Sequence, residues 1–279
     1  MIIAQLSDPH IVARGMLFKC SIQGVARDAE RIRREFDTAQ YLARAVATIN
    51  ELVPRPDVTV VTGDLVDHGE PEEYEHLRAL LAPLAMPVYV IPGNHDARAP
   101  LRDAFRTDGY FSDDGDLRYV IDGFPLRLVA LDTLVTGKHY GSLAAEQLDW
   151  LDAMLAAHRD RPTVVLMHHP PFATGITYMD NFRLDNAAAL GTVIGRHPQV
   201  ERILCGHLHR AIDRRFAGTV AGTAPGTAHQ IRINLVPGAQ ISFNFEPAGY
   251  QLHTWQDGSL VTHTALLGEW IEPLLSTAR

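Results

Sequence analysis

Short apolar runs alternate along the chain with segments whose apolar residues recur every three or four positions. The runs have the length of fully buried strands and occur at 2–6, 58–62, 88–91, 163–167 and 202–205. The helical spacing predicts helices over about 38–53, from Pro71 through Leu84, over 144–158 and over 186–196. This alternation of strands and helices is typical of an α/β fold.

Two further patterns concern the middle and the end of the chain. Strands predicted at 119–121 and 126–131 flank Asp122-Gly123, a turn signal, and so indicate a hairpin. Beyond Arg210 the helical spacing stops. Short alternating segments at 241–245, 250–255 and 260–264 predict a β-rich C-terminal part over about 211–279, as a β-rich half or a second sheet. Because no linker composition is present, we expect a single domain over 1–279.

The composition narrows the class of protein. Of the 279 residues, 46% are hydrophobic and 21% are charged, which excludes disordered, collagen-like and coiled-coil chains. The apolar runs are far shorter than the roughly 20 residues of a membrane-spanning helix. The N-terminus lacks the features of a signal peptide, and Cys20 and Cys205 are too few for a disulfide framework. We therefore expect a cytoplasmic protein that does not bind membranes.

The net charge and the histidine content indicate which kinds of ligand the protein binds. A formal net charge of −8 argues against a surface that binds a nucleic acid polymer. A small anionic substrate stays compatible with this charge, because bound cations can reverse the local field. The 14 histidines are the unusual feature of the composition, and their positions matter more than their number.

Polar side chains gather directly after the predicted strands. Asp8 and His10 follow the first run, Asp64 the second, Asn94 the third, His168 the run at 163–167, and His207 and His209 the run at 202–205. One such residue alone is more often a turn residue or a helix N-cap than a ligand. However, the carboxyl ends of parallel strands meet at one edge of a sheet, so these residues should converge. In an extended segment, Asp-x-His and His-x-His spacings also place both side chains on one side.

The donor types indicate a transition-metal site. Carboxylates, imidazoles and one amide, without a thiolate, suit Mn, Fe, Zn or Co better than a cysteine-based zinc site or an all-oxygen calcium site. Seven ligands are too many for one tetrahedral ion, whereas two ions that share Asp64 would use all of them. Two metals about 3.5–4 Å apart form the clamp used for in-line displacement at phosphorus. Gly63, Gly93 and Gly206 precede these ligands, where the backbone must turn tightly.

Taken together, the motifs identify a family. The chain carries Ser-Asp-Pro-His at 7–10, Gly-Asp-Leu-Val-Asp at 63–67, Gly-Asn-His-Asp at 93–96, His-His-Pro-Pro at 168–171 and Gly-His-Leu-His at 206–209. In this order the blocks resemble the calcineurin-like metallophosphoesterases, and among them the bacterial class III cyclic nucleotide phosphodiesterases and glycerophosphodiesterases. The resemblance spans about 2–230. The stretches at 69–74 and 225–230 support the narrower placement.

The resemblance implies a fold and a ligand set. It predicts a four-layer αββα sandwich of two mixed β-sheets flanked by helices, with a dimetal site at the sheet edge. One metal would be held by Asp8, His10 and His209, the other by Asn94, His168 and His207, with Asp64 bridging. Pro9 stands where the family usually has Thr, which leaves both neighbouring ligands intact. A charged insertion at about 20–35 would form a solvated helix face or, alternatively, a lid or a contact between copies of the chain.

The same resemblance suggests a mechanism. Metal-bound hydroxide would attack the phosphate, and His95 would contact the phosphate or protonate the leaving oxygen. Asp96 would orient His95 or a neighbouring loop, Asp67 could support the bridging loop, and His229 would lie near the substrate. His169 should point away from His168 and pack. Aromatic residues could line a pocket or belong to the core, namely Phe172, Tyr178, Phe182, Phe243, Phe245 and Tyr250.

We therefore predict a dinuclear phosphodiesterase for small phosphodiesters, with 3′,5′-cyclic nucleotides such as cAMP as the expected substrates. Alternatives are a glycerophosphodiesterase, a broad phosphodiesterase or phosphomonoesterase, and a metal-free interaction scaffold, although a scaffold would be expected to lose ligands. A homo-oligomer is compatible with the sequence. The motif blocks contain no Lys or Arg that would stabilise the extra negative charge of a monoester. Arg98, Arg183 or Arg210, which flank the blocks, would supply such a cation if the side chain points into the site.

Overall fold

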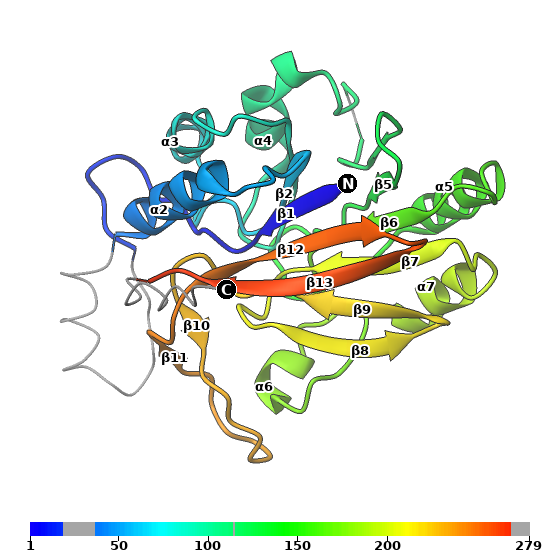
Figure 1. Ribbon diagram of the computed structural model, residues 1–279. Coiled ribbons are helices and arrows are strands. Elements are labelled where there is room, and N and C mark those ends of the chain that lie inside the picture. The colour runs from blue at the N-terminus through cyan, green and yellow to red at the C-terminus, as the bar shows by residue number, and fades with distance from the viewer. Residues whose placement is uncertain (19–36, 114, 269–279) are drawn as a thin grey trace, which may run out of the picture.

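The computed structural model describes residues 1–18, 37–113 and 115–268. The charged insertion expected at about 20–35, together with Cys20, lies outside the described residues. The described chain forms two β-sheets that face each other, with helices on both outer faces (Figure 1). This arrangement confirms the predicted α/β sandwich. None of the described helices is long and apolar enough to cross a membrane.

The first sheet contains the N-terminal strands and the last strands of the chain. Its spatial order is β13 (Ser259–Leu266), β12 (Gly249–Gln256), β1 (Ile2–Leu6), β2 (Val58–Thr62) and β3 (Val88–Ile91). Strands β1, β2 and β3 run parallel, whereas β12 is antiparallel to both β1 and β13. The sheet is therefore mixed, and the carboxyl ends of its three parallel strands share one edge.

The second sheet is six-stranded and also mixed. Its spatial order is β4 (Tyr119–Ile121), β5 (Arg127–Ala130), β6 (Thr163–Leu166), β7 (Val200–Cys205), β9 (Thr219–Thr223) and β8 (Ile212–Phe216). Strands β5, β6, β7 and β9 run parallel. A separate pair, β10 (Gln230–Ile231) and β11 (Phe243–Asn244), forms the base of an arm that projects from the body (Figure 1).

Helices cover the outer faces because their apolar residues recur on one side. Those on the first sheet are α2 (Thr38–Glu51), α3 (Pro71–Leu81) and α4 (Arg98–Ala104), and those on the second are α5 (Ala145–Ala156) and α7 (Ala187–Ile194). In α2 the buried residues Leu42, Val46 and Ile49 follow helical spacing, and the side chain of Asp37 caps the first turn by accepting from the backbone N–H of Ala39. A third apolar core, with Val60 and Leu128 among its members, fills the space between the sheets.

Three parts of the fold differ from the sequence expectations. The C-terminal segments do not form a second sheet of their own, because β12 and β13 extend the first sheet and β8 and β9 extend the second. Helix α4 was not predicted. The short helix α6 (Thr177–Asp180) was not predicted either.

Candidate metal and phosphoester site

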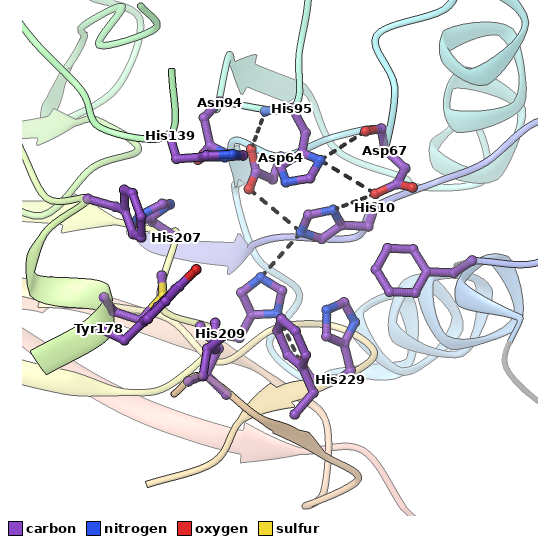
Figure 2. A pocket seen from close by; sticks show the side chains of 16 residues that line it. His10, Asp64, Asp67, Asn94, His95, His139, Tyr178, His207, His209 and His229 are labelled. Atoms are coloured by element: carbon purple, nitrogen blue, oxygen red, sulfur yellow. Dashed lines mark hydrogen bonds and ion pairs between the residues drawn. The ribbon is translucent and has the colours of Figure 1, made fainter. Parts of the chain in front are cut away.

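The residues singled out at the strand ends converge at the edge where the parallel strands of both sheets end. His10 Nε2 lies 3.6 Å from Asp64 Oδ2, and His168 Nε2 lies 3.4 Å from Asp64 Oδ1. His209 Nε2 lies 3.5 Å from Asp8 Oδ1, and His168 Nε2 lies 3.3 Å from Asn94 Oδ1. The His207 ring lies 5.1 Å from the His168 ring. The structure thus brings all seven predicted ligands together, six of them buried. Figure 2 shows His10, Asp64, Asn94, His207 and His209 of this set.

The backbone at five of these seven residues is left-handed rather than extended. Positive φ angles occur at Asp8 (51°), His10 (44°), Asp64 (46°), His207 (73°) and His209 (49°). Non-glycine residues seldom adopt this conformation, and it concentrates at functional sites. The expectation that Asp-x-His and His-x-His share a side because the chain is extended is therefore wrong. These side chains converge because the chain leaves each strand through a tight left-handed turn.

Glycine is required where two of these turns touch. A Cβ on Gly93 would overlap the backbone and carboxylate of Asp64, and a Cβ on Gly206 would overlap the carbonyl of Thr62. The loops after β2, β3 and β7 can pack this closely only because neither glycine has a side chain. The predicted role of these glycines is thus confirmed by the geometry.

Hydrogen bonds fix the orientation of the imidazoles. His168 donates from Nδ1 to the carbonyl of Thr62 (2.8 Å), and His209 donates from Nδ1 to the carbonyl of His229 (3.0 Å). His10 Nδ1 lies 3.4 Å from Asp67 Oδ1. In each ring Nε2 is left to face the carboxylates, which is the arrangement that metal-binding histidines adopt.

His207 provides a test of whether the residues fit a metal. Its side chain is buried, yet neither Nδ1 nor Nε2 has a hydrogen-bond partner among the described residues. Such orphaned buried atoms are rare in proteins and call for a ligand or ion. Burial lowers the pKa of His10 and His207, and that of His209 to about 4, which favours the neutral form that binds a metal. At His168 burial also lowers the pKa, but the charge of Asp64 outweighs it and raises the pKa to about 9. The donor set therefore fits two transition-metal ions.

His95 lies beside this cluster and is held by Asp67. Its Nδ1 donates to the backbone carbonyl of Asp67 (2.9 Å), and its backbone N–H donates to Asp64 Oδ1 (2.9 Å). Burial lowers the pKa of His95, but the charge of Asp64 and the hydrogen bonds to Asp67 outweigh burial and raise this pKa to about 10. The ring lines the pocket with Nδ1 already used, so Nε2 is the nitrogen available to a ligand (Figure 2).

Asp96 does not have the first of its two expected roles, that of orienting His95. Its carboxylate accepts from the backbone N–H groups of Leu65 (3.1 Å) and Gly93 (2.7 Å) and from the hydroxyl of Tyr74 (3.0 Å). None of its described hydrogen bonds reaches His95. Of the two roles considered, Asp96 fits that of holding the loops after β2 and β3 together, while Asp67 holds His95.

His229 and His169 lie on opposite sides of the ligand cluster. The His229 ring lines the pocket 4.5 Å from the His209 ring. His169 Nδ1 lies 2.8 Å from the hydroxyl of Thr133, and its Nε2 lies 3.2 Å from the carbonyl of His139. Both ring nitrogens have protein partners, in agreement with the expected packing role, but the His169 ring lies 4.8 Å from the His168 ring, so the expectation that it points away from His168 is wrong.

An apolar wall completes the pocket, whose volume is about 280 Å³. Among the aromatic candidates, Tyr178, Phe182 and Phe243 line it. The other candidates do not, since Phe172 and Tyr250 belong to cores under the helices and Phe245 is exposed. Residues that the sequence did not single out also line it, namely Phe18, His139, Met179, Ile231 and Ile241. They come from α6, from the β10–β11 arm and from two loops, and nothing in their local pattern marks them.

No Lys or Arg of the described residues lines this pocket. Arg98 forms a two-pronged ion pair with Asp132 (2.6 and 2.9 Å). Arg210 pairs with Glu246 (2.6 Å), and Arg183 donates to the carbonyl of Asp180 (2.6 Å). The three arginines that could have supplied a cation are therefore engaged elsewhere.

The comparison with known families agrees with this geometry. The sequence model of the calcineurin-like phosphoesterases matches residues 1–211. The chain belongs to the calcineurin-like phosphoesterase family. It is a metal-dependent phosphoric diester hydrolase, and the family implies a dinuclear metal site, for which the buried His and Asp clusters supply the donors.

Two relatives and one structure show the range of similarity. The chain is 34% identical over 275 residues to a "probable glycerophosphodiester phosphodiesterase" of Arcobacter nitrofigilis. The aligned region covers 98% of this chain and 96% of the relative. It is 31% identical to a 3′,5′-cyclic-nucleotide phosphodiesterase of Nostoc sp., with 93% and 90% covered. A dimetal phosphatase from Danio rerio has the same fold, with a TM-score of 0.67 at 15% identity over 96% of this chain and 97% of that chain.

Proposed function

We propose that this phosphodiesterase hydrolyses small phosphodiesters and that 3′,5′-cyclic nucleotides such as cAMP are its substrates. The observation that carries the proposal is the pocket beside the ligand cluster. Aromatic side chains form one wall of this pocket, and none of the described residues that line it is Lys or Arg. A nucleobase can stack on aromatic rings, which stabilises binding by about 1–3 kcal/mol per base. The volume of about 280 Å³ suits a small ligand rather than a polymer.

In this proposal two ions would be held by the residues described above. Asp8, His10 and His209 would hold one and Asn94, His168 and His207 the other, while Asp64, which lies 3.6 Å from His10 and 3.4 Å from His168, would serve both. The chemistry that such ions supply is Lewis acidity toward the phosphate oxygens and a lowered pKa of water. Mn, Fe, Zn and Co all suit this mixture of nitrogen and oxygen donors.

His95 would act on the phosphate or on the leaving oxygen. Its Nδ1 is fixed on the carbonyl of Asp67, so Nε2–H is directed into the pocket. A proton held there can be donated to a phosphate oxygen or to the departing alkoxide. His229, whose ring lies on the other side of His10, would contact the substrate (Figure 2).

The charge of the lining favours diesters over monoesters. A monoester dianion brings one more negative charge than a diester, and Asp64 and Asp67 both border the pocket. Arg98 and Arg210 form ion pairs elsewhere, and Arg183 donates to a backbone carbonyl. No Lys or Arg of the described lining therefore offsets that extra charge beyond what His95, with its raised pKa, contributes to both substrates. We therefore expect a higher kcat/KM for 3′,5′-cAMP than for 5′-AMP at neutral pH under the same metal loading.

Glycerophosphodiesters are the second candidate substrates. The similarity to the Arcobacter nitrofigilis protein over nearly the whole chain favours them. The test is substrate profiling of purified, metal-loaded protein with 3′,5′-cAMP, glycerophosphoethanolamine and 5′-AMP. A higher kcat/KM for the glycerophosphodiester would replace the first candidate by the second. More efficient cleavage of 5′-AMP would refute the preference for diesters while leaving the metal site intact. A cytoplasmic location and a homo-oligomer stay predictions of the sequence.

A further inference from the structure

A line of buried polar side chains connects Asp8 to the C-terminal strands of the first sheet. It consists of Ser7, Thr62, Gln5 and His253, and the exposed fraction of each is 0%. Polar groups buried this deeply between two sheets cost free energy unless their hydrogen bonds are satisfied. Their arrangement therefore needs a structural or functional reason.

The contacts near Asp8 form a continuous chain. The hydroxyl of Ser7 donates to Asp8 Oδ2 (2.5 Å), and the hydroxyl of Thr62 donates to that of Ser7 (2.8 Å). The amide of Gln5 donates from Nε2 to Thr62 Oγ1 (2.9 Å). Each link has the geometry of a good hydrogen bond.

Gln5 also ties the two sheets together. Its Nε2 donates to the carbonyl of Cys205 in β7 of the second sheet (2.9 Å), while its Oε1 lies 3.0 Å from His253 Nε2. His253 in turn lies 2.8 Å, through Nδ1, from the hydroxyl of Thr262 in β13. Gln5 therefore makes hydrogen bonds to strands of both sheets at the end nearest the site.

The directions of these hydrogen bonds are determined. A flipped Gln5 amide would set its oxygen against the Cys205 carbonyl, two acceptors facing each other, so both N–H groups point to Cys205 and Thr62. The Thr62 hydroxyl accepts from Gln5 and has two acceptors within reach of its single proton, Ser7 Oγ at 2.8 Å and the carbonyl of Leu6 at 3.3 Å, of which Ser7 is the nearer. Ser7 gives its proton to Asp8, so a row of donors leads from Gln5 through Thr62 and Ser7 to the carboxylate.

Thr62 has a second contact with the ligand cluster. Its backbone carbonyl accepts from His168 Nδ1 (2.8 Å), so one residue supports a ligand of each proposed metal position. Asp8 also accepts backbone hydrogen bonds on both oxygens from His207 N (3.0 and 3.1 Å). With Ser7 on Oδ2, the carboxylate is held so that Oδ1 faces His209 Nε2.

We propose that Thr62 and Gln5 are positioning residues for the dimetal site, which fix the Asp8 carboxylate through Ser7 and are themselves anchored by His253. This inference rests on the metal positions of the proposed function. Partners that orient a metal ligand in this way change metal affinity about 10–100-fold when they are removed. The part of the chain beyond residue 211 thereby contributes to the metal site although it contains none of the proposed ligands.

Thr62→Val is the decisive variant, because valine keeps the shape and the backbone carbonyl and removes only the hydroxyl. Thr59→Val is the matched control, since Thr59 lies on the same strand and is equally buried, but its hydroxyl has no hydrogen-bond partner among the described residues. The measurement is a titration of the metal-depleted protein with Co²⁺, followed by its visible absorption. Thr62→Val should weaken one of two Co²⁺-binding steps at least tenfold, and Thr59→Val should weaken neither.

Two further variants keep the test decisive if Thr62→Val folds poorly. Ser7→Ala removes the last donor to Asp8 and should weaken the same Co²⁺ step. His253→Gln retains a donor for Gln5 Oε1 and should bind Co²⁺ like the parent chain, whereas His253→Leu should bind it less tightly.

Unchanged Co²⁺ affinity in Thr62→Val and Ser7→Ala would overturn the inference, and so would equal weakening of both steps. A parent chain that binds fewer than two Co²⁺ ions would instead overturn the proposed metal positions.

Discussion

A positive charge introduced at His139 should raise kcat/KM for a phosphomonoester relative to kcat/KM for a phosphodiester. His139 is exposed at the border of the pocket, with its ring 6.3 Å from that of His95 and 5.6 Å from that of Phe182. Lysine carries a compact and permanent charge on a flexible stem. His139→Lys therefore places a cation near the proposed phosphate position without changing a proposed metal ligand.

The separation sets the expected magnitude. We take 6.3 Å, the distance between the rings of His95 and His139, as the distance from the new charge to a phosphate beside His95. At an effective dielectric constant of about 40, intermediate between a protein surface and water, each additional unit of substrate charge gains about 1.3 kcal/mol. This corresponds to an approximately tenfold rise in kcat/KM for 5′-AMP relative to 3′,5′-cAMP.

The assay compares both substrates under the same metal loading, at low salt and at about 1 M salt. His139→Gln is the control, because it replaces the ring by a neutral side chain and separates the effect of charge from that of the lost imidazole. The tenfold shift should shrink at high salt, where the Debye length falls to about 3 Å. A ratio of kcat/KM values that is the same in His139→Lys and His139→Gln would refute the argument that the missing cation sets the substrate preference.

Three further outcomes are expected. Elemental analysis after loading with Mn or Zn should approach two ions per chain and fall at both sites in Asp64→Ala, whereas full activity with no more than one ion would exclude the dinuclear arrangement. His95→Ala should keep its metals and lose about 10²–10⁴-fold in turnover, with a smaller loss on an aryl ester whose leaving group needs no proton; equal losses on both substrates would leave His95 only a binding role. Burial and the charge of Arg202 lower the pKa of His253 from 6.5 to about 3, so the unfolded chain takes up the proton first as the pH falls. The free energy of unfolding should therefore decline below pH 6.5, and His253 should account for about 2 kcal/mol of this decline at pH 5. Urea unfolding of chelator-treated protein should show that His253→Gln lacks this contribution. If the parent chain and the variant gave parallel curves of unfolding free energy against pH, this prediction would be contradicted.

The strands and the convergence of the proposed metal ligands could be predicted because local sequence carries both signals. Buried parallel strands are continuous apolar runs, and the observed β1, β2 and β3 coincide with the runs at 2–6, 58–62 and 88–91. The topology then requires that residues after such strands meet at one edge. Asp8, Asp64 and His168 each follow a parallel strand, so their positions along the chain, together with their residue types, predict that they converge.

The pocket walls could not be predicted, because long-range contacts create them. Helix α6 lies after β6, and Met179 packs with Ile231 of the distant β10–β11 arm into one apolar cluster. Neither segment shows a periodic pattern that would identify its neighbour. The same holds for Asp67 and Asp96. Their motifs predicted that they support neighbouring groups, but the groups that they contact depend on how the loops after β2 and β3 pack together.

The division of the chain between chemistry and selectivity follows from these contacts. All of the proposed metal ligands lie within residues 1–211, the part that matches the family. The pocket, however, is completed by His229, Ile231, Ile241 and Phe243 from beyond this part. Metals held by the shared residues would supply the same chemistry to any phosphate, so discrimination between leaving groups would come from the residues around them. Differences in substrate among relatives should therefore be sought in the segment that carries β10 and β11, since it contains none of the proposed metal ligands.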